Sequence, residues 1–226
     1  MKKNIIVLVF LLISYIGNTQ NIPNDNLDKL VSNFTKELIE KKIDTICIYE
    51  SYSVGSEITF EISELNEREK QELCRDELIN QPVFVFWKEK GKTFLNKINS
   101  CFEYSAIEIL EDELWKIYFE NTIAIEKEKV KNFEYESFIN GKKISSPIFR
   151  DHSYHQNFKF IINNKIVEKY FDNFKLQNET DNFKDKRLYN INYNHNTTLK
   201  SKKIIDILEN DIRNIKRNQY LIMKKR

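Results

Sequence analysis

Apolar residues recur at intervals of three and four in two stretches, one near each end of the chain. In the first stretch, which follows Asn24 and Asp25, they are Leu27, Leu30, Val31, Phe34 and Leu38. In the second, which follows Ser201, they are Ile204, Ile205, Leu208, Ile212 and Ile215. This spacing predicts an amphipathic helix ending near Lys42 and a final helix capped by Ser201.

Between these helices, β-branched and aromatic residues form short runs that predict strands. Val83 to Lys88 and Lys92 to Ile98 flank Gly91 and predict a hairpin, whose first strand is apolar on both faces and therefore central. The other predicted strands are 45–52 and 57–62 around Gly55, 102–109, 144–149, and 158–162 and 166–176 around Asn163-Asn164. Charged segments at 63–79 and after 111–113 predict two further helices.

Together these elements predict a single α+β domain over residues 21–218. It is an antiparallel sheet built from hairpins and flanked by N-terminal and C-terminal amphipathic helices. No repeat of fixed period and no Pro/Gly-rich linker divides this part of the chain. The asparagine-rich stretch near 177–200 predicts a long polar loop, and residues 219–226 predict a frayed basic tail.

The first 20 residues have the pattern of a cleaved signal peptide. Residues 2 and 3 are lysines, residues 5–16 are uncharged and apolar, and Gly17 and Thr19 are small residues before a cut at Gln20. As a helix, the apolar run would span about 18 Å, which is too short for a hydrocarbon core of about 30 Å. We therefore expect a secreted or periplasmic protein with no membrane span after cleavage.

The composition admits one ordinary hydrophobic core. Of 226 residues, 41% are hydrophobic and 31% charged, with 4 Gly and 3 Pro, which excludes collagen-like and wholly disordered chains. Asn, Ile and Lys make up 86 residues against 2 Ala, as AT-rich coding produces, so lysine clusters carry little weight by themselves.

Charge is divided unevenly along the chain. Without the signal segment the formal charge is zero, but residues 21–150 sum to −7 and residues 151–226 to +7. The two parts complement each other, or the basic part faces an anionic partner, or the surface simply reflects lysine-rich coding.

Three cysteines remain after signal cleavage, an odd number for an oxidising compartment. Cys47 lies in a continuously apolar run and is expected to be an inert core thiol. The predicted disulfide joins Cys74 and Cys101. No CxxC pair supports a metal site built from these cysteines.

A metal constellation is suggested by Asp151, His152 and His155, with His195 as a distant third imidazole. Against it, a spacing of three puts the two histidine side chains on opposite faces of a strand, and no HExxH motif is present. Exposed or structural histidines are the competing interpretation.

Other chemistries find little support in the sequence. There is no GxSxG turn of a nucleophilic hydrolase and no phosphate-binding glycine loop. Glycoside hydrolysis would need paired acids and aromatic residues, but the acids are more simply explained as helix surface and the aromatics as core. Export and a formal charge of zero argue against nucleic-acid binding.

The sequence therefore favours an exported, non-enzymatic protein that binds another protein or an envelope component and needs no cofactor. Its predicted contact surface is Lys202, Lys203 and Lys216 on the final helix. The alternative is a secreted hydrolase with a metal or carboxylate site near Asp151, His152 and His155. A structural component of the cell envelope is a third possibility.

Overall fold

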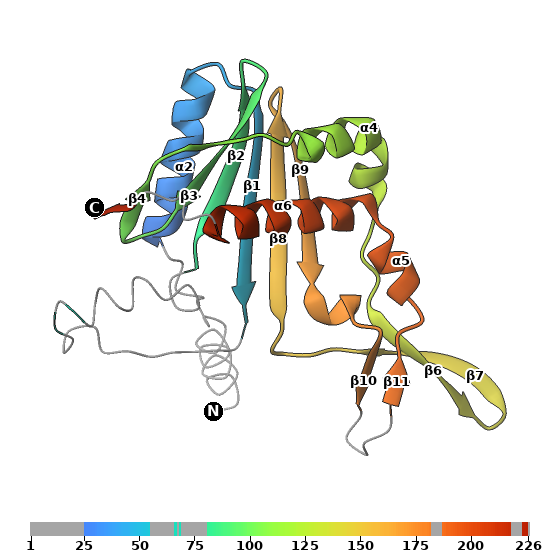
Figure 1. Ribbon diagram of the computed structural model, residues 1–226. Coiled ribbons are helices and arrows are strands. Elements are labelled where there is room, and N and C mark those ends of the chain that lie inside the picture. The colour runs from blue at the N-terminus through green and yellow to red at the C-terminus, as the bar shows by residue number, and fades with distance from the viewer. Residues whose placement is uncertain are drawn as a thin grey trace, which may run out of the picture.

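The computed structural model describes residues 25–54, 66, 68, 81–181, 187–217 and 223–225. Figure 1 shows the path of the chain. The elements in chain order are α2 (Asp25–Glu40), β1 (Thr45–Ser53), β2 (Val83–Glu89), β3 (Lys92–Ile98), β4 (Phe102–Tyr104), β5 (Ile107–Ile109), α4 (Glu113–Lys127), β6 (Phe133–Ile139), β7 (Lys142–Ile148), β8 (Tyr154–Ile162), β9 (Lys165–Asp172), η2 (Asn173–Leu176), β10 (Glu179–Asp181), β11 (Arg187–Tyr189), α5 (Tyr193–Thr197), α6 (Lys200–Arg217) and β12 (Met223–Lys225).

The centre of the fold is a six-stranded antiparallel sheet with the order β5-β3-β2-β1-β8-β9. The hairpins β2–β3 and β8–β9 are joined through β1, which pairs with β2 on one side and β8 on the other. The structure confirms the predicted α+β single domain, with an antiparallel sheet of hairpins and helices at its N-terminal and C-terminal ends.

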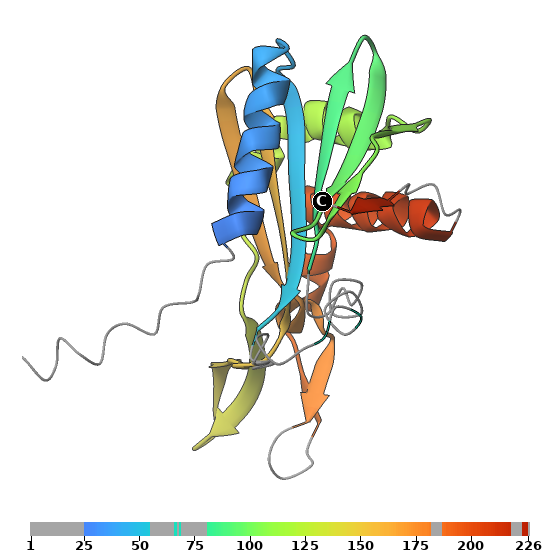
Figure 2. The ribbon, with the colours of Figure 1, turned by 90° about the vertical axis from the view of Figure 1, so that its left-hand side faces the viewer.

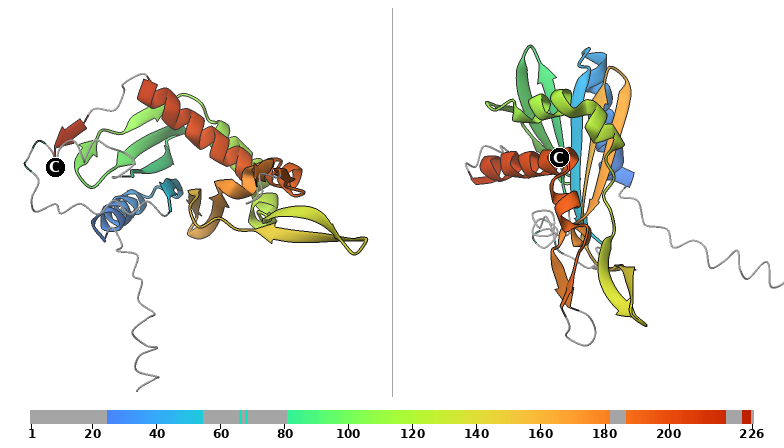
Figure 3. Two further views of the ribbon diagram at one scale, coloured as in Figure 1. Left: turned by 90° about the horizontal axis from the view of Figure 1, so that it is seen from below. Right: turned by 90° about the vertical axis from the view of Figure 1, so that its right-hand side faces the viewer.

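Helices cover both faces of the sheet. Figure 3 shows α4 and α6 on one side and α2 on the other. The larger core lies under α4 and α6, where Trp115, Phe158 and Phe160 are fully buried. The smaller core lies under α2 and includes Leu38 and Ile46. Strand β2 is buried from Val83 to Trp87, which confirms that it is a central strand.

Glu128, which follows α4, ties that helix to the start of α6. Its carboxylate accepts hydrogen bonds from the Lys200 N–H at 2.8 Å, the Ser201 N–H at 2.9 Å and the Ser201 hydroxyl at 2.8 Å. Ser201 was predicted to cap this helix, but it lies inside the first turn, so Glu128 supplies the acceptor that the free N–H groups need.

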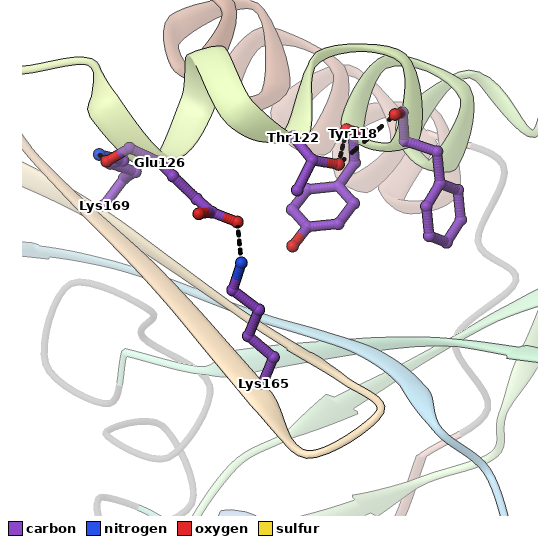
Figure 4. Close-up of polar contacts among 6 residues, drawn as sticks. Tyr118, Thr122, Glu126, Lys165 and Lys169 are labelled. Atoms are coloured by element: carbon purple, nitrogen blue, oxygen red, sulfur yellow. Dashed lines mark hydrogen bonds and ion pairs between the residues drawn. The ribbon is translucent and has the colours of Figure 1, made fainter.

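The hairpin β8–β9 also contacts the C-terminal end of α4, as Figure 4 shows for the ion pair between Glu126 and Lys165. The Lys169 ammonium donates to the carbonyls of Glu126 at 3.0 Å and Glu128 at 2.8 Å. Burial lowers the pKa of Lys169, and the neighbouring carboxylates of Glu128 and Glu126 oppose that shift. A cation at the C-terminal carbonyls of α4 also matches the negative end of the helix dipole.

The stretch near 177–200 is more ordered than the predicted polar loop. It contains the hairpin β10–β11 and the short helix α5. Buried asparagines supply its hydrogen bonds: Asn190 Nδ2 donates to the carbonyls of Lys175 at 3.0 Å and Gln177 at 3.1 Å. Asparagine side chains add to the backbone pairing of β10 with β11 here, so a polar composition does not mean an unstructured segment.

The basic tail also differs from its prediction. Residues 223–225 form β12 and pair with β4, with Lys224 opposite Glu103, instead of fraying. The predicted signal segment 1–20 lies outside the described residues, as do the strand at 57–62 and, apart from residues 66 and 68, the helix at 63–79. None of the helices that the structure describes is long and apolar enough to cross a membrane.

Candidate functional site

A pocket of about 350 Å³ opens between the C-terminal half of α6 and the sheet. Figure 1 shows α6 crossing the sheet over β1 and β8. The lining residues are Tyr49, Ser51, Ser53, Gln81, Pro82, Phe84, Tyr154, Glu209, Ile212, Arg213 and Lys216.

Periodicity places these side chains together. Alternate residues of a strand share a face, so Tyr49, Ser51 and Ser53 all point from β1 toward α6. On the helix, residues three and four apart share a side, which brings Glu209, Arg213 and Lys216 to the side of α6 that faces the pocket.

The floor of the pocket is a buried polar network. Tyr49 is 2% exposed and its hydroxyl donates to Glu209 Oε1 at 3.2 Å. Gln156, on β8 and 4% exposed, donates from Nε2 to the same oxygen at 2.5 Å and to the Tyr49 hydroxyl at 3.3 Å. Buried polar groups are stable only when they are paired, so this network fixes the direction of the Glu209 carboxylate.

The two phenols of the pocket are held in their neutral form. Burial, aided by the Glu209 carboxylate, raises the pKa of Tyr49 far above its ordinary value. Burial also raises the pKa of Tyr154, although a hydrogen bond with Ser51 opposes that shift. Both phenols therefore stay protonated at physiological pH; the Tyr49 O–H is used by Glu209, which leaves the Tyr154 O–H as the phenol donor for a ligand.

Two cationic side chains stand at the rim. Arg213 makes no ion pair with any acid that the structure describes, and the Lys216 ammonium lies 5.6 Å from the centre of the Phe84 ring. Among the described residues, the lining holds one acid, Glu209, whose Oε1 accepts hydrogen bonds from two neutral donors, so two cationic side chains stand against one carboxylate in the pocket. The arrangement can hold an anionic group between cations and hydroxyl donors.

Of the three lysines predicted as a contact surface, the pocket contains one. Lys216 lines it, whereas Lys202 forms an ion pair with Asp206 and Lys203 lies 4.0 Å from Glu113. Lys202 and Lys216 are separated by about 20 Å along the helix. The structure thus separates Lys202 and Lys203 from Lys216.

The histidines of the predicted metal site do not converge. His152 is exposed, while His155 is buried and uses both ring nitrogens: Nε2 is 3.1 Å from the Ser153 hydroxyl and Nδ1 shares a hydrogen bond with the Tyr170 hydroxyl. His195 is bonded through Nε2 to the Lys129 carbonyl at 3.1 Å.

The ring contacts of His155 also favour a structural role: its ring centre lies 5.2 Å from that of Tyr170, on which it stacks, and 5.4 Å from that of Tyr52, which is tilted against it. Asp151 is exposed beside His152. Among the residues that the structure describes, no group of three or more His, Cys, Asp or Glu is arranged to hold a metal ion.

Of the two predictions about cysteines, the structure tests the one for Cys47 and not the disulfide. Cys47 is free and fully buried, and burial raises the pKa of its thiol, as expected for an inert core residue. Cys74 lies outside the described residues, so its pairing with Cys101 stays a prediction.

Asp211 is a buried carboxyl on α6, one residue before Ile212 of the pocket, and faces the first turn of α4. Burial, together with the charges of Glu111 and Glu113, raises its pKa from 3.8 to about 7. Between these values the folded protein keeps a proton that the unfolded chain releases, so Asp211 lowers stability as pH rises from about 4 to about 7, and the loss levels off above that range.

Asp211→Asn should therefore flatten the pH dependence of unfolding. At about pH 8 we expect the variant to be more stable than the wild type by about 1 to 2 kcal/mol, an amount reduced by residual solvent screening, and near pH 4 the difference should vanish. Urea unfolding at both pH values checks this, with the exposed Asp206→Asn on the same helix as control. Parallel pH profiles for wild type and Asp211→Asn would contradict it.

Comparison with protein-family models, with curated proteins and with solved structures finds no match for this chain. The fold is that of an α+β protein, and the pocket beneath its C-terminal helix is lined by two cationic side chains and one carboxylate.

Most of the pocket was not predicted from the sequence. Tyr49, Gln156 and Glu209 come from three elements, and Tyr49 and Glu209 are 160 residues apart. One signal was available: Tyr49, Ser51 and Ser53 place polar groups on the same face of a strand that begins with the apolar run Ile46-Cys47-Ile48.

Proposed function

We propose that this is an exported binding protein, periplasmic or extracellular and non-enzymatic, that holds an anionic group of its partner in the pocket under α6. The observation that carries the proposal is the pair of cations, Arg213 and Lys216, above a floor in which Tyr49 and Gln156 donate to the Glu209 carboxylate. The charge division of the sequence supports it, because residues 151–226 carry +7 and include both cations.

The pocket suits a limited part of a partner rather than a large surface. Its volume of about 350 Å³ is at the lower end of the range for small-ligand sites, enough for an acidic side chain or a small anionic substituent. The Phe84 ring and Ile212 give such a group an apolar wall, and the hydroxyls of Ser51 and Tyr154 give it hydrogen-bond donors.

Reversal of the two pocket cations tests this function. We expect Arg213→Glu/Lys216→Glu to lower recovery of the partner from envelope and medium fractions by about tenfold or more, since two charge-assisted contacts become repulsive. The matched control is Lys202→Glu/Lys203→Glu, which makes the same charge change on the same helix at residues outside the pocket. It should bind as the wild type does.

The outcome is decided by the difference between the two variants. Equal loss in both would mean that binding depends on the general charge of α6, and equal retention would remove the pocket from the binding site. The unfolding midpoints of both variants in urea show whether each one is folded.

A further inference from the structure

The β6–β7 hairpin stands apart from the six-stranded sheet and carries large apolar side chains at its end. Figures 1 and 2 show it extending away from the sheet next to the β10–β11 hairpin. Near its tip Phe138 is 74% exposed, Ile139 54% and Ile144 38%. Exposed apolar groups at the end of a projecting element usually mark a contact with another apolar phase or molecule.

The exposed groups lie on both faces of the hairpin. In the strand register, Phe138 is opposite Lys143, Ile139 opposite Lys142, and Ile144 opposite Ser137. Successive residues of a strand point to opposite faces, so Phe138 lies on one face and Ile139 and Ile144 on the other. A protein partner that covered one face would leave the other in water, whereas the interior of a lipid layer covers both at once.

Lysines accompany these apolar groups on both faces. Lys142 and Lys143 are the direct cross-strand neighbours of Ile139 and Phe138, and residues 137–144 contain no acid. The nearest acid, Glu136, forms an ion pair with Lys143 at 2.7 Å. Lysine side chains can reach from an apolar environment to a polar boundary, and they are attracted to the anionic headgroups there.

The tip has the dimensions of an element that inserts into the headgroup boundary. Asn140 and Gly141, both with positive φ, form a tight turn, so no long loop extends beyond Ile139 and Lys142. The pair Ser137–Ile144 lies two residues further back, about 7 Å along the strands. Amphipathic elements in membrane interfaces bury their apolar groups to about 5 to 10 Å.

We propose that the tip of the β6–β7 hairpin, residues 137–144, docks on an anionic phospholipid surface. Phe138, Ile139 and Ile144 insert between the lipids, and Lys142 and Lys143 lie at the headgroups. This contact is independent of the pocket under α6, which lies on other elements of the fold. The protein would then bind its partner while held at a membrane surface.

Flotation with lipid vesicles tests the proposal. The wild type should float with vesicles of phosphatidylcholine and phosphatidylglycerol, and less with phosphatidylcholine alone or at high salt. Phe138→Ser/Ile139→Ser should lower the bound fraction by about tenfold or more. The matched control is Phe119→Ser/Ile123→Ser, which removes an exposed pair, 52% and 70% exposed, from α4. It should float as the wild type does.

A second measurement does not require a polar substitution. In Phe138→Trp, the added indole should shift its emission to shorter wavelength with anionic vesicles and be quenched by brominated lipids. Trp87 and Trp115 are buried, so the emission of the wild type should not change when vesicles are added and gives the background signal. The proposal is overturned if the indole does not respond, if wild type and tip variant float equally, or if the tip substitutions only convert a dimer to a monomer.

Discussion

Trp115→Ala should lower the free energy of unfolding by about 4 kcal/mol, the largest single effect we expect. Trp115 is fully buried on α4 and packs edge-on against Phe160, with ring centres 5.8 Å apart. Its indole N–H donates a hydrogen bond to the Thr93 hydroxyl at 3.0 Å, and the Thr93 hydroxyl in turn donates to the Asp112 carboxylate at 3.0 Å. Truncation therefore leaves a cavity in the larger core and removes a buried hydrogen bond.

Two other variants separate packing from the hydrogen bond. Trp115→Phe keeps much of the volume but loses the donor, so it should cost clearly less than the alanine variant. Phe119→Ala removes an aromatic ring from the same helix that is 52% exposed, and should cost less than about 1 kcal/mol. Urea unfolding measures all three; a cost below about 1 kcal/mol for Trp115→Ala would contradict the packing described for α4.

Asn196→Ala should lower the free energy of unfolding by about 2 to 3 kcal/mol. Asn196 is fully buried; its oxygen accepts from the Lys131 N–H at 2.9 Å, and its Nδ2 donates to the carbonyls of Lys131 at 2.9 Å and Lys175 at 2.8 Å. One side chain thus satisfies three backbone groups of two distant segments, and alanine leaves all three without that partner.

The neighbouring asparagine provides the control for this prediction. Asn194 is exposed in the same short helix, so Asn194→Ala should change stability by less than about 0.5 kcal/mol. Similar unfolding curves for Asn194→Ala and Asn196→Ala would show that α5 is not anchored through its asparagine side chain.

The elements of the fold that could be predicted are those specified by residues close together in the sequence. The β2–β3 hairpin was predicted because its apolar runs flank a turn at Lys90 and Gly91, both of which have positive φ in the structure. The apolar stripe of α6 likewise predicted its buried face, from Ile204 to Ile215.

Long-range pairing could not be predicted in this way. Strand β1 was expected to pair with residues 57–62, yet from Ile46 to Glu50 it has β2 on one side and β8 on the other. Both partners become neighbours only when the sheet assembles, and no local pattern in 45–52 specifies them. Strand β6 was missed although Asn140-Gly141 is a strong hairpin signal and four of the seven residues of the strand are aromatic or aliphatic, because the pattern does not define where the preceding helix ends.

The candidate site shows the same limit. The charge division pointed to α6, and Lys216 does line the pocket, but Lys202 and Lys203 share only its charge and not its position. Tyr49, Gln156 and Glu209 form the floor through contacts between elements that are distant in sequence. Their importance follows from burial and pairing, neither of which a single sequence displays.

The binding account is tested most directly by titrating the isotopically labelled protein with inorganic phosphate at constant ionic strength and following its NMR resonances. We expect saturable shifts centred on Ser51, Tyr154 and Arg213, and their loss in Arg213→Glu/Lys216→Glu but not in Lys202→Glu/Lys203→Glu. Shifts that do not saturate, that spread equally to Lys202 and Lys203, or that persist in the pocket variant would contradict the assignment of this pocket as an anion site.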